Sequence, residues 1–279
     1  MPDNKISPTT PAETNNRLVR LSALFSRVSL LWWVALINLS DIALAETFTV
    51  LVEPRVGLVM HGLILLSLML QVALSSAETD QHFLTALALA PLIRLMSLVL
   101  PLSNFPLVTW YMMVGAPLFM AAIFAARAGR LSRADLGLKW GNLPFQFLVS
   151  LTGIGLGYLE YRILTPEPLV AALNWEQIWL PALILLVFTG LLEEFVFRGL
   201  LQYTAMRSLG WAGLIYSAAV FSVLHMGYKS WQDLVFVFGV ALLFGWVVRR
   251  SGSILGVSIA HGFTNISLFL IFPFLLGGG

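Results

Sequence analysis

The sequence contains no cysteine among its 279 residues, and only 11% of them are charged. The absence of cysteine excludes disulfides and thiolate chemistry, and it leaves histidine, glutamate and asparagine as the side chains able to hold a metal. The shortage of charge separates the chain from soluble domains, in which about 25% of residues are charged. A net charge of only +2, with no basic helix, argues against a nucleic-acid partner. With 58% hydrophobic residues and a mean hydropathy of +0.87, the composition predicts a polytopic membrane protein.

Long apolar runs are what the sequence has in abundance. Because a helix needs about 20 apolar residues to cross a bilayer, we expect an all-α fold, a bundle of eight or nine transmembrane helices. The nine candidate spans are 28–46, 56–75, 83–102, 107–126, 143–163, 178–200, 211–226, 232–248 and 254–275. The segment 211–226 is short for a span, so eight spans stay open beside nine.

Polar and basic segments divide the chain into regions. We expect a disordered cytoplasmic tail at 1–27, a four-helix membrane region at 28–126, a basic cytoplasmic loop at 127–142 and a core at 143–275. With nine spans and a cytoplasmic N-terminus, all the arginine clusters fall on the cytoplasmic side, as the positive-inside rule requires. The sequence indicates no role for region 28–126.

Three glycines at alternate positions mark the fifth span. Gly153, Gly155 and Gly157 lack side chains that would keep another helix away. We therefore expect close packing of a neighbouring helix along this span.

Two adjacent carboxylates, Glu193 and Glu194, interrupt the sixth apolar run, and Arg198 follows them. A carboxylate at the centre of a membrane helix costs about 2.5–3.5 kcal/mol on insertion scales, so it needs a partner or a use. Glu194 and Arg198 are four residues apart and share a helix face, which predicts an ion pair. Glu193 points about 100° away from Glu194 and is the candidate general base. A charge cluster that only locks two helices together fits this segment equally well.

Further polar residues lie in apolar surroundings downstream. His225 ends the run F-S-V-L-H, and a lone histidine near a helix end is more often an interfacial residue than a ligand. His261 and Asn265 are four residues apart, so both face one way and both can donate hydrogen bonds to an oxyanion. Hydrogen bonding between helices is the alternative for this pair. Together these residues supply a base (Glu193), two imidazoles (His225 and His261) and an amide (Asn265). This set of groups fits the hydrolysis of an amide bond.

Three spaced motifs carry a family resemblance. They are E-E-F-V-F-R at 193–198, F-S-V-L-H at 221–225 and H-G-F-T-N at 261–265. In order and spacing they resemble the E-E-x-x-x-R, F-x-x-x-H and H-x-x-x-N series of the CAAX protease and bacteriocin-processing (CPBP, or Abi) family. This is a family of glutamate-type intramembrane endopeptidases related to Rce1-type prenyl proteases. The resemblance covers roughly residues 135–272 and implies a catalytic core of about five helices.

The resemblance also implies roles for the residues of the motifs. Glu193 and His225 would bind and activate the attacking water, and His261 and Asn265 would stabilise the oxyanion. The supporting residues would be Glu194 and Arg198. No cofactor is certain from the sequence, although Glu193, His225 and His261 offer the nitrogen and oxygen ligands that zinc accepts. The H-E-x-x-H motif of another zinc protease class is missing.

The expected partners are the lipid bilayer and a peptide or protein substrate. Prenylated proteins and bacteriocin precursors are the two substrate kinds that the resemblance implies. We expect a prokaryotic plasma membrane, because no feature indicates a eukaryotic organelle. A non-catalytic immunity or scaffold protein of the same fold is the alternative. A transporter is a third hypothesis, which the lack of an internal repeat disfavours.

The predicted site residues lie at different distances from the cytoplasmic ends of their spans. At 1.5 Å per residue, Glu193 and His261 lie about 10 Å from the cytoplasmic ends of their predicted spans. His225 lies about 21 Å from Trp211 on the same scale. These depths agree only if the span 211–226 is tilted, starts later, or follows an interfacial helix at 200–210.

Overall fold

The computed structural model describes residues 11–100 and 102–277, and within them every regular element is helical. The all-α fold predicted from composition is therefore confirmed. The α-helices are α1 (Pro11–Leu51), α2 (Pro54–Leu74), α3 (Glu78–Leu87), α4 (Leu89–Val99), α5 (Leu107–Ala128), α6 (Leu143–Leu164), α7 (Trp175–Leu185), α8 (Leu192–Glu194), α9 (Tyr203–Leu209), α10 (Ala212–Val223), α11 (Trp231–Ser251), α12 (Leu255–Ile266) and α13 (Phe272–Leu276). Three π-helical segments, η2 (Leu186–Leu191), η3 (Phe195–Gln202) and η5 (Ser267–Ile271), and two 3₁₀ turns, η1 (Leu102–Asn104) and η4 (Met226–Tyr228), complete the chain.

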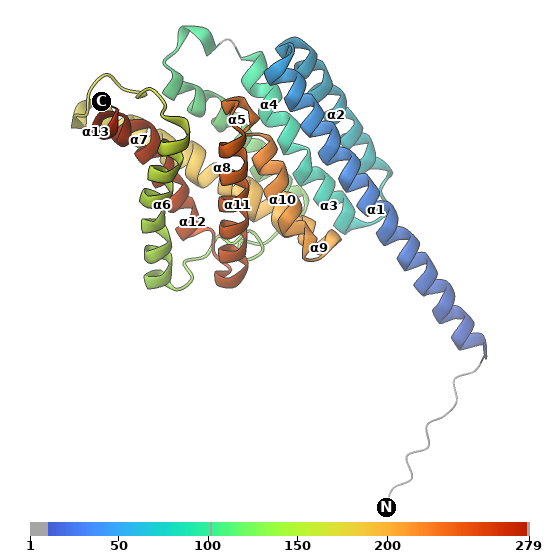
Figure 1. Cartoon of the computed structure of the whole chain (residues 1–279). Coiled ribbons are helices and arrows are strands. Elements are labelled where there is room, and N and C mark those ends of the chain that lie inside the picture. Colours follow the sequence, from blue (N-terminus) through green and yellow to red (C-terminus); the bar gives the residue numbers. More distant parts are fainter. Residues whose placement is uncertain (1–10, 101, 278–279) are drawn as a thin grey trace, which may run out of the picture.

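Part of the predicted N-terminal tail lies outside the described residues, namely 1–10. From Pro11 onward the backbone is helical and belongs to α1, which extends away from the bundle at its N-terminal end (Figure 1).

Eight helices of the described chain are long and apolar enough to cross a membrane. They are Leu30–Leu51, Pro54–Leu74, Glu78–Val99, Leu107–Ala128, Leu143–Leu164, Trp175–Leu209, Trp231–Ser251 and Leu255–Leu276. The chain is therefore a multi-pass membrane protein built as a helix bundle (Figure 1). The remaining predicted span, 211–226, corresponds to the shorter apolar segment Ala212–Tyr228, in which α10 has only 12 residues.

The helix that carries Glu193 is longer than the sequence analysis predicts. α7, η2, α8, η3 and α9 continue one another from Trp175 to Leu209, a length of 35 residues. No separate helix begins at 200–210, because the residues up to Leu209 continue this long helix. Glu193 consequently lies about 24 Å from Leu209 along this helix, close to the distance of about 21 Å between His225 and Trp211. The disagreement between these two depths disappears.

The basic loop between α5 and α6 explains the depth of His261. Its residue Gly137 accepts a hydrogen bond from the backbone N–H of Ile254, at 3.0 Å, just before α12 begins. The same loop lies against Gly199 of η3, where an added Cβ would come within 3.0 Å of the Leu136 carbonyl oxygen. α12 therefore starts beside the middle of η3, well inside the end of the long helix, and His261 reaches the level of Glu193.

Asp135 fastens this loop to the long helix. It accepts hydrogen bonds from the Ser132 hydroxyl at 2.6 Å and the Ser132 backbone N–H at 2.9 Å, and a further one from the Tyr203 hydroxyl. The Ser132 hydroxyl, followed by Tyr203, lowers the pKa of Asp135 below its ordinary value, because these bonds favour the ionised carboxylate. The loop is thus held by a charge that persists at neutral pH.

α6 and α12 pack against each other through glycine. A Cβ at Gly153 would lie 2.0 Å from the Ala260 carbonyl oxygen, and one at Gly157 would lie 2.6 Å from that of Thr264. Gly155 has nothing within 4 Å. The predicted close packing is therefore confirmed for Gly153 and Gly157. It is wrong for Gly155, since a residue two positions away on a helix does not share the face.

Gly153→Ala is expected to destabilise the protein by about 1–3 kcal/mol, the usual cost of overpacking. The new methyl group would displace the α12 backbone, which carries His261 one residue after Ala260. Gly155→Ala is the matched control on the same helix, and it should leave the unfolding temperature unchanged or slightly raised. Thermal unfolding in detergent compares the two variants, and equal shifts would contradict the packing described for α6 and α12.

Candidate active site

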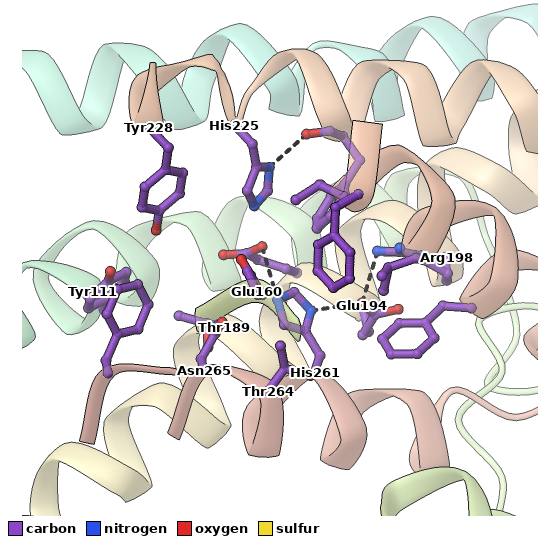
Figure 2. A pocket seen from close by; sticks show the side chains of 17 residues that line it. Tyr111, Glu160, Thr189, Glu194, Arg198, His225, Tyr228, His261, Thr264 and Asn265 are labelled. Carbon is purple, nitrogen blue, oxygen red and sulfur yellow. Dashed lines mark hydrogen bonds and ion pairs between the residues drawn. The ribbon is translucent and has the colours of Figure 1, made fainter. Parts of the chain in front are cut away.

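A buried cavity of about 60 Å³ lies among the helices of the second half of the chain. All six residues predicted to form the site line it: Glu193, Glu194, Arg198, His225, His261 and Asn265. They come from the long helix, from the end of α10 and from α12, and Figure 2 shows the labelled members pointing toward one another. A space of this size holds a few water molecules. The structure thus brings the separate polar islands of the sequence into one place.

Glu194 is the fully buried centre of this cluster. Its Oε1 accepts a hydrogen bond from Arg198 Nη1 at 2.8 Å and another from His261 Nδ1 at 2.9 Å (Figure 2). The ion pair predicted from the four-residue spacing is confirmed. Because a carboxylate only accepts hydrogen bonds, the proton of this contact sits on Nδ1 of His261. Arg198 also lies 4.4 Å from the centre of the Phe221 ring, which adds a cation–π contact.

Glu193 is held less tightly than its neighbour. Its side chain is 26% exposed, and its Oε2 lies 3.8 Å from His261 Nε2. Within the described chain no side chain or backbone group donates a hydrogen bond to the Glu193 carboxylate at shorter range. Both oxygens therefore remain available to a molecule in the cavity.

His225 sits where α10 gives way to η4, and its ring is fixed by the backbone. Nδ1 lies 2.8 Å from the carbonyl oxygen of Phe221 (Figure 2). Since a carbonyl can only accept, the Nδ1 atom carries the proton, and Nε2 of the neutral ring is an acceptor. The Phe221 ring lies near both imidazoles, tilted against His225 with centroids 4.6 Å apart and edge-on to His261 with centroids 5.9 Å apart.

Asn265 is oriented by the π-helical segment η2. Its Nδ2 donates to the Thr189 hydroxyl oxygen at 2.8 Å, and that hydroxyl in turn donates to the Leu185 carbonyl. A side-chain amide nitrogen has two N–H donors, so one remains for another acceptor. π-helical segments are often found at functional sites, and η2 and η3 flank the two glutamates on either side.

A comparison with protein families matches this segment. Residues 175–267 fit the family model of Rce1-like proteins, described as type II CAAX prenyl endopeptidase Rce1-like. The match covers 93 of the 279 residues, and this segment is similar to that family. The match includes all six predicted site residues and confirms the resemblance seen in the motifs. Comparison with curated proteins and with solved structures gives no significant match.

The Rce1-like family is a protease family that acts on peptide or protein substrates in membranes. At the level of the family, the chain is therefore related to peptidases.

The three residues suggested as zinc ligands are not arranged as a metal site. In the part of the chain that the structure describes, no group of three or more His, Asp, Glu or Cys side chains is placed to hold a metal ion. His261 Nδ1 is engaged by Glu194, and its Nε2 and the nearer Glu193 oxygen lie 3.8 Å apart. Zinc stays a prediction from the sequence.

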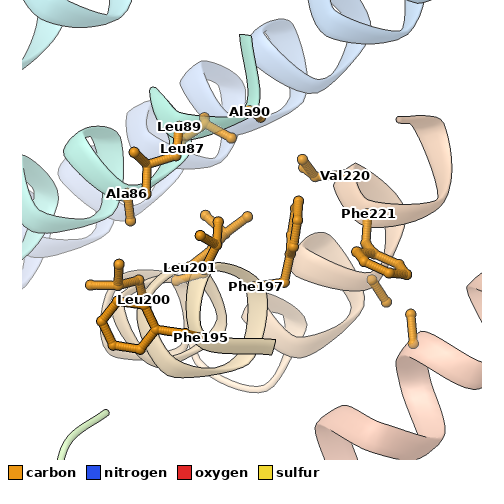
Figure 3. Packing of buried hydrophobic residues seen from close by; sticks show 14 of the residues in the cluster. Ala86, Leu87, Leu89, Ala90, Phe195, Phe197, Leu200, Leu201, Val220 and Phe221 are labelled. Atoms are coloured by element: carbon orange, nitrogen blue, oxygen red, sulfur yellow. The ribbon is translucent and has the colours of Figure 1, made fainter. Parts of the chain in front are cut away.

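The N-terminal helices pack directly onto the Rce1-like segment. Leu87 of α3 and Leu89 of α4 are buried in the same apolar core as Leu201 of η3 and Phe221 of α10 (Figure 3). Two regions that the sequence analysis separates at the central loop thus share one core.

A charge cluster in these N-terminal helices reaches the site, although the sequence does not predict it. Glu46 and His61 are fully buried, with His61 Nε2 lying 3.2 Å from Glu46 Oε1. Arg94 Nε donates to Glu46 Oε1 at 2.7 Å, and its Nη2 forms an ion pair with Glu46 Oε2 at 2.6 Å and donates to the Leu224 carbonyl at 2.9 Å. Leu224 directly precedes His225. The only signal in the sequence is that Arg94 interrupts an apolar span.

Arg94→Lys is expected to lower peptide cleavage by roughly 10- to 100-fold, the range that follows from a displacement of about 1 Å at a reacting group. Lysine keeps a charge beside Glu46, but a single ammonium cannot reproduce the contacts that the guanidinium makes with Glu46 and Leu224. The effect should fall on kcat more than on KM, since His225 is displaced and no substrate contact is lost. Arg162→Lys, at an exposed position of α6, is the control. Equal kcat values for both variants would show that Arg94 does not position His225.

A second, larger cavity adjoins the first between α4, α5 and the Rce1-like segment. It has a volume of about 310 Å³ and a mostly apolar lining. Four residues line both cavities: Tyr111, Glu193, His225 and Tyr228. Glu193 and His225 therefore stand where a small polar cavity meets a larger apolar one.

Proposed function

We propose that this chain is an intramembrane endopeptidase that hydrolyses a peptide bond with a water activated by Glu193 and His225. The family match supports a peptidase in general terms. One observation carries the specific proposal: Glu193, His225, His261 and Asn265 line one water-sized cavity, although they come from three separate parts of the chain.

The proposed first step is activation of a water between two acceptors. Glu193 offers an unengaged carboxylate, and His225 offers Nε2, because its Nδ1 is turned to the Phe221 carbonyl. A water molecule donates one proton toward each. When its oxygen attacks the substrate carbonyl carbon, Glu193 takes one of these protons as general base, a role typically worth about 10²–10⁴ in rate.

The negative charge that develops on the carbonyl oxygen then needs hydrogen-bond donors. Asn265 has one amide N–H left beside its bond to Thr189. His261 donates from Nε2 when its ring is an imidazolium, whose charge the ion-paired Glu194 balances. Donors fixed in this way stabilise a tetrahedral oxyanion without reorganising.

Breakdown of the tetrahedral species completes the reaction. Glu193 passes its proton to the amide nitrogen, the carbon–nitrogen bond breaks, and a carboxylic acid and an amine are released. The apolar cavity of about 310 Å³ beside Glu193 suits an apolar stretch of substrate or a lipid chain attached to it. A prenylated C-terminus and a bacteriocin precursor are the substrate kinds we propose. The proposed setting is a prokaryotic plasma membrane with the N-terminus in the cytoplasm.

The proposal is tested by comparing membrane peptides by mass spectrometry between cells with the wild-type protein and cells with Glu193→Ala. Cleaved peptides present only with the wild-type protein are expected, and they would name the substrate. Identical peptide sets at equal protein levels would contradict the proposal. That outcome is what the alternative, a non-catalytic immunity or scaffold protein, predicts.

A further inference from the structure

A third carboxylate faces the cavity that holds Glu193 and Glu194. Glu160, on α6, is only 6% exposed and lines this cavity. Figure 2 shows its side chain among the labelled polar residues. Glu160 lies outside the three motifs and outside the segment that matches the Rce1-like family. The proposed hydrolysis does not use it.

Glu160 has no lysine or arginine partner in the described chain. No hydrogen bond or ion pair to its carboxylate is present among these residues. Arg198 is the single lysine or arginine that lines the cavity, and Glu194 already holds it at 2.8 Å. Asp233 and Glu193 add negative charge nearby, and His261, the neighbour that can carry a positive charge, is already paired with Glu194. A buried carboxylate without a counter-charge is unfavourable, so this end of the cavity is complementary to a cation.

The position of Glu160 relates it to the bond that is cleaved. Gly153 meets Ala260 and Gly157 meets Thr264, so α6 and α12 run side by side in the same direction. Continuing this register places Glu160 about six residues, or about 9 Å, beyond the level of His261. An extended peptide advances about 3.3 Å per residue. A group bound at Glu160 therefore belongs to a substrate residue about one to three positions from the cleaved bond.

We propose that Glu160 forms a subsite for an ammonium group of the peptide substrate, close to the cleaved bond. An ammonium is about the size of a water molecule and fits a cavity of about 60 Å³, whereas a guanidinium is larger and planar. The ammonium is that of a lysine side chain or that of a free N-terminus, and the experiment separates these two sources. This inference rests on the proposed peptidase function, since it names the substrate group that the same cavity recognises.

Cleavage of synthetic peptides in liposomes tests the subsite. One peptide set carries lysine at each position within three residues of the cleaved bond, and its matched set carries norleucine, which has similar length and no charge. The wild-type protein should prefer one lysine peptide by about 30-fold or more in kcat/KM, since loss of one partner of a buried charge pair has effects of this size. Glu160→Gln should reduce the preference to near unity, and Glu160→Asp should keep part of it. Glu167→Gln, at an exposed loop position, is the control and should keep the full preference.

Acetylation of the peptide N-terminus separates the two sources of the ammonium. If the preference follows the free terminus, acetylation removes it and lysine substitution has no effect. If it follows a lysine side chain, acetylation has no effect. A preference that Glu160→Gln leaves intact, or the absence of any ammonium preference in the wild-type protein, would overturn the proposal.

Binding to Glu193→Ala keeps this test independent of turnover. Fluorescently labelled lysine and norleucine peptides are titrated against Glu193→Ala and against the double variant Glu193→Ala/Glu160→Gln. Tighter binding of the lysine peptide, lost in the double variant, supports the subsite even if no peptide is cleaved by any form of the protein. In that case the proposed hydrolysis fails and the ammonium site stands. Equal binding of both peptides overturns the subsite, whatever the cleavage results.

Discussion

Glu193→Gln is expected to lower kcat by about 10²- to 10⁴-fold, the range that a positioned general base contributes. The amide has the shape of the carboxylate, so the cavity keeps its volume, but it cannot take the proton of the attacking water. The Glu193 carboxylate accepts no hydrogen bond from the described chain, and its nearest charged contact is 3.8 Å away. The substitution therefore removes chemistry and leaves the fold intact.

The measurement is turnover of a cleaved peptide by purified protein in liposomes, with thermal unfolding recorded for each variant. Glu176→Gln is the control, because Glu176 lies in the first turn of α7, at the exposed start of the same long helix. It should retain the wild-type kcat. Wild-type turnover by a folded Glu193→Gln protein would show that Glu193 is not the base.

Glu194→Leu is expected to destabilise the protein by about 3–5 kcal/mol, the usual cost of removing one partner from a buried ion pair. Glu194 is fully buried and accepts hydrogen bonds from both Arg198 and His261. Without it, the Arg198 guanidinium is buried without its hydrogen-bonded carboxylate. The double variant Glu194→Leu/Arg198→Met removes both charges and should recover most of the lost stability, since apolar replacements of buried pairs are often neutral.

Activity should not recover together with stability in this double variant. His261 loses the carboxylate that fixes its ring, so cleavage is expected to stay low in both the single and the double variant. The stability control is Glu78→Gln, which breaks the exposed contact between Glu78 and His82 and should cost less than about 1 kcal/mol. Equal unfolding temperatures for the single and double variants would show that Glu194 and Arg198 do not stabilise each other.

The features predicted correctly from sequence are those set by local spacing. Glu194 and Arg198 pair because residues four apart meet on a helix, and no tertiary information is needed for that. The apolar runs predict eight of the membrane helices, since the bilayer fixes their length. The motifs around His225, His261 and Asn265 identify residues that line one cavity, but through the resemblance to a family and not through geometry.

The features that were missed depend on contacts between distant helices. The hydrogen bond from His261 to Glu194 and that from Arg94 to the Leu224 carbonyl join residues 67 and 130 positions apart. Glu160 appears in the sequence as one acidic residue near the end of a span, and only the register of α6 against α12 places it at the cavity. The π-helical segments on either side of Glu193 likewise have no signature in composition.

The central claim is that Glu193 and His225 act on the same water molecule, and a double-variant comparison of kcat tests it most directly. The variants are Glu193→Gln, His225→Asn and both substitutions together. Residues that act as a unit have strongly non-additive effects, so the double variant should be no slower than the slower single variant within a few-fold. If the two losses instead multiply in the double variant, Glu193 and His225 work independently and the shared-water account is wrong.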